Sequence, residues 1–301
     1  MRKLLYFLVI CLAYSCVNFT PKYAYEISYS FDNAENISNE AKRITLEVIK
    51  KRLSKFSGGV DVTMDSKDEI LIKLKSDFKI ERINNIILNE GKLDFWPCYS
   101  HYDVFTFLSD ADKLNQDDEK SSILETLVQS YSDKGLITVK ITDTVAFNTF
   151  INQENIKTLF KEDFKHLKFL YDEPVNGYIN IYGVKTNDKG RALVNEGHIT
   201  EVIQDFDQLN RPGVSINMND YGAYSWEKVT NDAYRTGTCI AICLNDVVRS
   251  APTVSNGAIK GGRSQISGDF SLEEAQNLSY ILSSHKRIPK LKFLQVTELE
   301  K

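Results

Sequence analysis

Apolar and polar side chains follow two different periods along this 301-residue chain. Apolar residues that recur every three or four positions predict one face of a helix, whereas alternation predicts a half-buried strand. The helical period covers residues 38–53, 78–89, 123–131, 144–164, 220–234 and 271–284. The strand pattern, or a short apolar run, covers residues 60–64, 70–74, 92–99, 136–141, 178–184, 199–206, 214–218, 239–244, 263–267 and 291–296. The stretch 17–37 predicts an extended leader, and the acidic stretch 108–122 predicts a loop.

Capping residues indicate where several of these helices begin. Ser38 is a good N-cap for the first helix, whose polar face carries Arg52. Asn219 or Asp220 caps the helix over 220–234. Ser271 and Glu274 form a Ser-x-x-Glu capping box, in which both side chains accept hydrogen bonds from otherwise unpaired backbone N–H groups.

The order of the elements indicates the fold class. Residues 38–99 run helix, strand, strand, helix, strand, which predicts a two-layer arrangement of a sheet and helices. We expect an α+β fold made of two small sheet-plus-helix units (ferredoxin-like), with mostly antiparallel or mixed sheets. The expected divisions are a signal segment 1–16, a leader 17–37, a first unit 38–99, a variable insertion 100–176 and a second unit 177–301.

The N-terminus has the pattern of a secretory signal. Arg2 and Lys3 precede an apolar run of 11 residues, Leu4–Tyr14, which is shorter than the roughly 20 residues that span a bilayer as a helix. A small residue stands directly before Cys16, as in bacterial lipoprotein cleavage boxes. We expect Cys16 to carry lipid and to anchor the chain to a membrane; the alternative is a plain signal peptide. Val17 after the cysteine favours the outer membrane.

Composition and cysteine spacing argue against several classes of function. A net charge of −4 and a pI near 5.7 argue against a nucleic-acid partner. Cys239 and Cys243 lie on one face of a predicted strand, too far apart to bridge, so buried thiols are expected rather than a disulfide scaffold. The four histidines are isolated in sequence, and no Gly-x-Ser-x-Gly motif marks a nucleophile. We expect no metal, no cofactor and no catalytic residues.

The most informative stretch is 245–270. It combines a strand, a Ser-Ala-Pro corner, a glycine-rich loop and a second strand, followed at once by the capped helix. With its neighbours it resembles the head region of the SecD and SecDF protein-export family, in the version found in Bacteroidetes-type bacteria. The pieces that carry the resemblance include Asp205-Phe206-Asp207-Gln208, Arg211-Pro212-Gly213-Val214, Gly222-Ala223, Trp226, Ser250-Ala251-Pro252-Thr253-Val254, Gly261-Gly262-Arg263-Ser264-Gln265-Ile266-Ser267-Gly268 and Glu273-Glu274-Ala275.

The resemblance implies a site and a place in the cell. It identifies residues 38–99 as the family's periplasmic base and 177–301 as its head, which contacts emerging polypeptide. The implied binding residues are Ser250, Ala251, Pro252, Gly257, Ile259, Gly261, Gly262 and Arg263; the alternative is that they only build a tight turn. In the family, membrane helices with the transport motor follow the head. We expect this chain, which stops at Lys301, to lack that motor.

Three functions stay open from the sequence. The leading hypothesis is a non-catalytic domain on the periplasmic side of the envelope that binds exported or unfolded polypeptide, with the Sec translocon as a further partner, and so assists export or envelope assembly. The second is a scaffold that binds one folded partner through a sheet edge. The third is an envelope hydrolase that reuses the fold.

Overall fold

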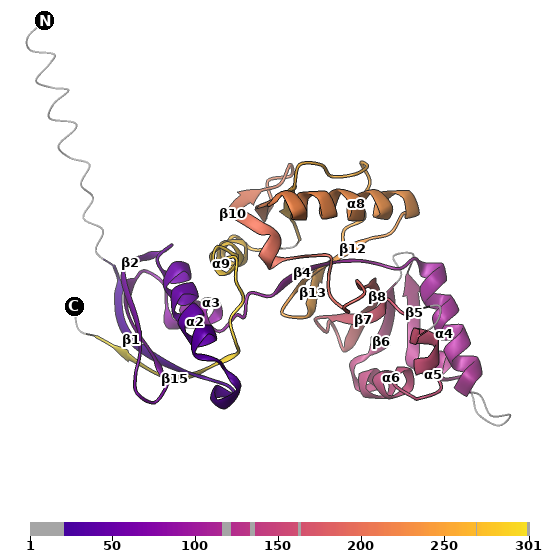
Figure 1. Ribbon diagram of the computed structural model, residues 1–301, viewed down its shortest axis with the longest axis horizontal. Helices are drawn as coiled ribbons and strands as arrows, with labels where there is room; N and C mark the ends of the chain where they lie inside the picture. The colour runs from indigo at the N-terminus through magenta and orange to yellow at the C-terminus, as the bar shows by residue number, and fades with distance from the viewer. Residues whose placement is uncertain (1–20, 116–121, 133–135, 162–163, 269, 300–301) are drawn as a thin grey trace, which may run out of the picture. The chain divides into compact units, whose positions relative to one another are not determined.

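The computed structural model describes residues 21–115, 122–132, 136–161, 164–268 and 270–299. The described chain forms two compact units: unit 1 runs to Leu88 and resumes at Pro289, and unit 2 is Asn89–Ile288 (Figure 1). The expected signal segment and the expected lipid site at Cys16 lie outside the described residues. Among the helices that can be described, none is both long and apolar enough to cross a membrane.

Unit 1 is a four-stranded antiparallel sheet with two helices. The strand order is β15-β1-β3-β2. Its elements are β1 (Tyr23–Phe31), the short 3-10 helix η1 (Ala34–Asn36), α2 (Asn39–Leu53), β2 (Ser57–Met64), β3 (Ile70–Ser76), α3 (Ile80–Ile87) and β15 (Leu291–Glu298). Alternate residues of β3 are buried, as are apolar side chains of α2 and α3, and together they form the core.

The structure of unit 1 differs from two of the expectations. The stretch expected as an extended leader contains β1, which pairs with β3 on one side and β15 on the other (Figure 1). The final strand β15 therefore lies in unit 1 and not with residues 177–288. Both pairings join segments distant in sequence, so no local pattern reports them.

Arg52 is a third departure in unit 1. The sequence places it on the polar face of α2, but the side chain is fully buried and donates a hydrogen bond from Nη1 to the Ile86 carbonyl oxygen at 3.1 Å. Burial lowers the pKa of the guanidinium to about 9. The expected N-cap is confirmed, since Ser38 Oγ accepts from the Ala41 N–H at 3.2 Å.

Unit 2 contains an eight-stranded mixed sheet, in the order β5-β6-β8-β7-β13-β12-β4-β9, and a three-stranded antiparallel sheet, β10-β11-β14. Its first half consists of β4 (Leu93–Pro97), α4 (His101–Asn115), α5 (Ile123–Leu127), β5 (Val128–Ser132), β6 (Leu136–Lys140), η2 (Ile141–Asp143), α6 (Thr144–Ile151), α7 (Lys157–Lys161), β7 (Leu167–Asp172), β8 (Tyr178–Lys185), β9 (Val194–Asn195) and η3 (Glu196–His198). Its second half consists of β10 (Ile199–Phe206), β11 (Pro212–Met218), α8 (Asp220–Thr236), β12 (Ile240–Leu244), β13 (Val247–Ser250), β14 (Arg263–Ile266) and α9 (Leu272–Leu282). The expected α+β class with antiparallel or mixed sheets is confirmed.

Sequence patterns were least reliable between residues 92 and 176. The strand expected over 92–99 is β4, but it pairs with β12 and β9 in unit 2 instead of completing the first unit. Part of the loop expected over 108–122 is the helix α4, whose face of Val104, Phe107, Leu108 and Ala111 is buried. Strand β7 was not predicted. In the last third, the predicted strands and helices are present.

Candidate functional site

The segment from β13 to β14 carries the chain between the two sheets of unit 2. Strand β13 pairs antiparallel with β12 and parallel with β7, whereas β14 pairs antiparallel with β11. The Ser-Ala-Pro corner ends β13, and residues 253–262 span the gap to β14. The stretch singled out from the sequence is therefore a link between two sheets.

Backbone hydrogen bonds fix this link at three points. Ile240 N donates to the Pro252 carbonyl oxygen at 3.0 Å, and Met218 N donates to the Gly262 carbonyl oxygen at 2.9 Å. Between them, Ile259 N donates to Thr230 Oγ1 on α8 at 2.9 Å. The link is thus tied to β12, β11 and α8.

Its glycines are required by the backbone. Gly257, Gly261 and Gly262 have φ of +84°, +76° and +68°, in the left-handed region that side chains disfavour. A Cβ at Gly262 would also lie 2.7 Å from Ala223 Cβ, whereas the space around Gly257 and Gly261 is open. Gly262 therefore permits both the turn and the close approach of α8.

A pocket of about 310 Å³, here called the loop pocket, lies beneath the link. Three kinds of residue line it: side chains of α8 and β12, the link itself, and the end of β14. They are Trp226, Ile240, Ile242, Pro252, Thr253, Val254, Ser255, Asn256, Gly257, Ala258, Ile259, Ser264, Gln265 and Ser267. None of these lining residues carries a titratable side chain, so the pocket offers apolar surface and neutral hydrogen-bonding groups.

Trp226, which lines the loop pocket, has a buried indole N–H. Its side chain is only 3% exposed and packs edge-on against Phe95, with ring centroids 5.1 Å apart. Its indole Nε1–H has no hydrogen-bond partner in the described structure. The hydroxyl of Ser250, at the corner, is likewise buried without a partner. Unpaired buried donors carry a desolvation penalty, which a bound acceptor would relieve.

The eight residues implied by the resemblance divide into three groups. Pro252, Gly257 and Ile259 line the loop pocket. Ser250, Ala251, Gly261 and Gly262 belong to the corner and the turn and do not line it. Arg263 borders a separate hollow of about 580 Å³ on the three-stranded sheet, beside Glu201 and Asp205.

Sequence reasoning missed the floor of the loop pocket. Trp226 was named only as part of the family resemblance, and Ile240 and Ile242 were placed only in a predicted strand. The sequence does contain a pattern that indicates the part of the pocket formed by α8. Gly222, Trp226 and Thr230 recur every four residues, which places them on one face of that helix. Thr230 holds the link and Trp226 lines the pocket.

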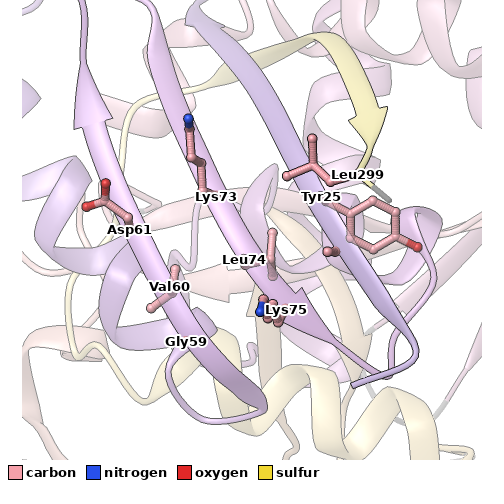
Figure 2. A pocket seen from close by; sticks show the side chains of 9 residues that line it. Tyr25, Gly59, Val60, Asp61, Lys73, Leu74, Lys75 and Leu299 are labelled. Atoms are coloured by element: carbon pink, nitrogen blue, oxygen red, sulfur yellow. The ribbon is translucent and has the colours of Figure 1, made fainter. Parts of the chain in front are cut away.

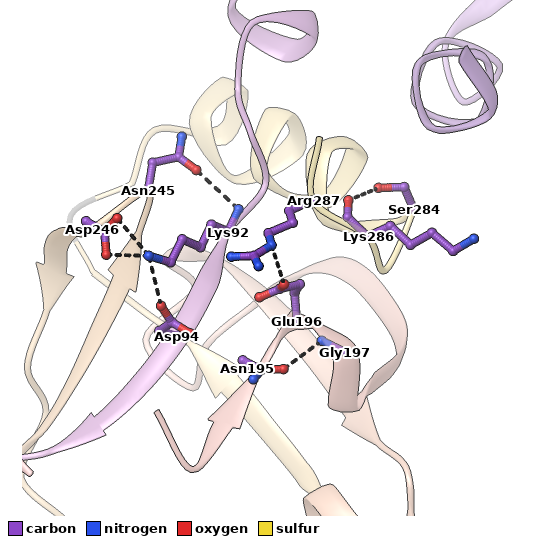
Figure 3. A network of polar contacts seen from close by, with 10 residues as sticks. All are labelled: Lys92, Asp94, Asn195, Glu196, Gly197, Asn245, Asp246, Ser284, Lys286 and Arg287. Atoms are coloured by element: carbon purple, nitrogen blue, oxygen red, sulfur yellow. Dashed lines mark hydrogen bonds and ion pairs between the residues drawn. The ribbon is translucent and has the colours of Figure 1, made fainter. Parts of the chain in front are cut away.

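A polar network lies elsewhere in unit 2 (Figure 3). Lys92 Nζ lies 2.6 Å from Asp246 Oδ1 and 3.9 Å from Asp94 Oδ2, and Arg287 faces Glu196 at 3.9 Å. Asp94 is buried, and desolvation raises the pKa of its carboxyl to about 6 despite the attraction of Lys92. None of the ionisable residues of this network lines the loop pocket.

Unit 1 has a pocket of its own, of about 350 Å³, here called the sheet pocket (Figure 2). It lies across adjacent strands, with Asp61 on β2, Lys73 on β3, Tyr25 on β1 and Leu299 after β15. Ala24, Gly59, Val60, Leu74 and Lys75 complete the lining. Regular strand residues form it, and charged side chains border it.

Comparison with known proteins places the loop pocket inside a matched region. Residues 180–286 match the family model described as "SecDF, P1 head subdomain". Over 112 residues the chain is 46% identical to the protein translocase subunit SecD of Rhodothermus marinus, an alignment covering 34% of this chain and 18% of that protein. It is 35% identical over 101 residues to SecDF of Thermus thermophilus, covering 34% of this chain and 13% of that protein. The chain thus spans less than a fifth of the length of these relatives.

Solved structures support the same assignment at the level of the fold. One described as "Crystal structure of SecDF in Super-membrane-facing form" aligns with 98% of this chain and 34% of its own, at a TM-score of 0.56 and 18% identity. Another, described as "Structure and function of a membrane component SecDF that enhances protein export", aligns over 90% of this chain and 98% of its own, with a TM-score of 0.52 and 18% identity. The expected resemblance to the SecD and SecDF head region is confirmed.

Proposed function

We propose that this chain is a non-catalytic, SecD-like domain that assists protein export by holding a segment of unfolded polypeptide in the loop pocket. The observation that carries the proposal is the unpartnered indole N–H of Trp226, a residue that lines a neutral pocket within the matched head region. A backbone carbonyl oxygen is an acceptor that every polypeptide presents. Such a contact suits clients of varied sequence.

The edge of the three-stranded sheet supports this role. Among the described strands, β14 pairs only with β11, and its residues Ser264 and Gln265 line the loop pocket. An extended chain can add to such an edge through main-chain hydrogen bonds, while a pocket alongside takes a side chain. Backbone pairing supplies affinity without fixing the client's sequence, and the apolar pocket favours one aliphatic or aromatic side chain.

The setting of this function is also a proposal. We place the chain on the periplasmic side of the envelope, near the Sec translocon, because its relatives are described as protein translocase subunits. A lipid on Cys16 would tether it to a membrane, with the outer membrane favoured. Mass spectrometry of the mature N-terminus tests the tether: acyl chains on Cys16 are expected, and an unmodified start at another residue contradicts it.

Site-specific photocrosslinking in intact cells tests the binding role. A photoreactive amino acid replaces Asn256, an exposed residue of the loop pocket, and a matched control replaces Asp61, an exposed residue of the sheet pocket. We expect position 256, and not position 61, to capture many exported proteins during their transit. Capture of one folded envelope protein would instead support the scaffold role, and no capture at position 256 would contradict both.

A further inference from the structure

Two buried cysteines face each other across neighbouring strands of unit 2. Cys98 directly follows β4 and Cys239 directly precedes β12. Pro97 is paired with Ile240, so the antiparallel register places Cys98 opposite Cys239. The Cys98 N–H donates to the Cys239 carbonyl oxygen at 3.0 Å, and the two Sγ atoms lie 2.7 Å apart.

This geometry is close to that of a disulfide. Opposed residues that share a backbone hydrogen bond in an antiparallel pair have Cα atoms about 5.5 Å apart, within the roughly 4.4–6.8 Å that disulfides span. The observed sulfur separation exceeds a disulfide bond by only about 0.7 Å.

We propose that Cys98 and Cys239 are the site of an oxidative modification, a disulfide that fastens β4 to β12. The oxidant is a disulfide, carried either by a small thiol compound or by an oxidoreductase. Each cysteine gives up its thiol proton, the two sulfurs share a new bond, and the two electrons reduce the oxidant's disulfide to two thiols. An oxidising compartment such as the periplasm supplies this class of oxidant.

Burial determines when the bond forms. Cys98 and Cys239 are 1% and 0% exposed, so a large oxidant reaches them only before the strands close. The contact with Cys239, together with burial, raises the pKa of the Cys98 thiol well above its ordinary value, which keeps the thiolate scarce in the folded protein. The bond is therefore expected to form during folding and then to resist exchange.

The bond would fix the floor of the loop pocket. Cys239 adjoins Ile240, which lines that pocket, and forms a β-bridge with Thr253 on the link. The closed loop includes the whole chain from residue 98 to residue 239, and long loops are those in which a cross-link restricts the unfolded state most. The inference does not depend on polypeptide binding.

Cys243 provides the matched control. It is buried on the same face of β12, where burial raises the pKa of its thiol to about 12, but the residue opposite it is Asp94. It therefore has no cysteine facing it across the β4–β12 ladder and is expected to stay reduced.

Refolding of the full chain in a mixture of oxidised and reduced glutathione tests the proposal. Free thiols are alkylated, the protein is digested, and the peptides are mapped by mass spectrometry. We expect one peptide pair joined through Cys98 and Cys239, lighter than the two thiol peptides by two hydrogen atoms. Cys243→Ser should keep the joined pair and Cys98→Ser should lose it. Reduction should lower the thermal midpoint by roughly 5–15 °C in the wild type and leave the midpoint of Cys98→Ser unchanged.

Two outcomes would overturn the proposal: alkylation of both Cys98 and Cys239 in the refolded wild type, or a link from either one to Cys243. The wild-type peptide map decides the question by itself if Cys98→Ser does not fold.

Discussion

The loop pocket and the sheet pocket have similar volumes but different construction. The sheet pocket lies on regular strands and is bordered by Asp61, Lys73 and Lys75. The loop pocket is covered by a glycine-dependent link, lacks charged lining residues, and is lined by Trp226, whose buried indole N–H has no partner. A hollow between strand side chains arises whenever a sheet faces solvent. An unpaired buried donor costs stability, and under the proposed function a bound acceptor would offset this cost.

Glycine substitutions test the difference in construction and have the largest expected effect. Gly262→Val would force a side chain against Ala223 at positive φ, so we expect a loss of about 4 kcal/mol in the free energy of unfolding. Gly257→Ala, at positive φ in open space, should cost about 1 kcal/mol. Gly59→Ala, in the sheet pocket, meets no neighbour and should be neutral within about 0.5 kcal/mol. Urea denaturation measures the free energy of unfolding of all three variants. Equal losses for Gly262→Val and Gly59→Ala would contradict the difference in construction between the two pockets.

The buried carboxyl of Asp94 gives unit 2 a specific pH dependence. Its folded pKa of about 6 lies above the unfolded value of about 3.9. Between these values the folded state holds a proton that the unfolded state has released, so stability falls as pH rises from about 4 to about 6. With screening by solvent, the loss is at most about 2 kcal/mol.

The substitution Asp94→Asn should flatten this slope and stabilise the protein above pH 6. The check is urea denaturation at a series of pH values between 4 and 8, comparing the free energy of unfolding of the two proteins. A slope that persists unchanged in the variant would show that another group is responsible.

Blocking each pocket with one large side chain tests where polypeptide binds. Ala258→Trp would occupy the loop pocket, and Val60→Trp would occupy the sheet pocket. We expect the first variant to weaken binding of a reduced and alkylated, permanently unfolded polypeptide at least tenfold, or about 1.4 kcal/mol, and the second to leave it unchanged. Fluorescence anisotropy gives the affinities, and circular dichroism confirms that both variants are folded. The reverse pattern would assign binding to unit 1.

Local chemistry explains what could be predicted from the sequence. The Ser271–Glu274 capping box is present as predicted, because a cap depends on residues within one turn. The glycines of the link have the positive φ that their residue type permits.

Long-range relations were not predictable in this way. The pairing of β15 with β1 joins the two ends of the described chain. The burial of Arg52 depends on the Ile86 carbonyl of another helix. Trp226 on α8 meets the loop pocket only through tertiary packing, so its unpaired N–H could not be inferred from periodicity. Helix α4 is a different case: Val104, Phe107, Leu108 and Ala111 have helical spacing, which the acidic residues between and after them obscured.

The most direct test of the account removes one hydrogen-bond donor. Trp226→Phe deletes the unpaired N–H of a tryptophan that lines the loop pocket, and Trp96→Phe deletes the equally unpaired buried N–H of a tryptophan that does not. If Trp226 donates to bound polypeptide, its variant should bind the unfolded polypeptide about fivefold more weakly, a loss of about 1 kcal/mol, while Trp96→Phe binds like the wild type. Both variants should unfold within about 1.5 kcal/mol of the wild type. Equal affinities for all three proteins would contradict the claim that the loop pocket holds polypeptide through Trp226.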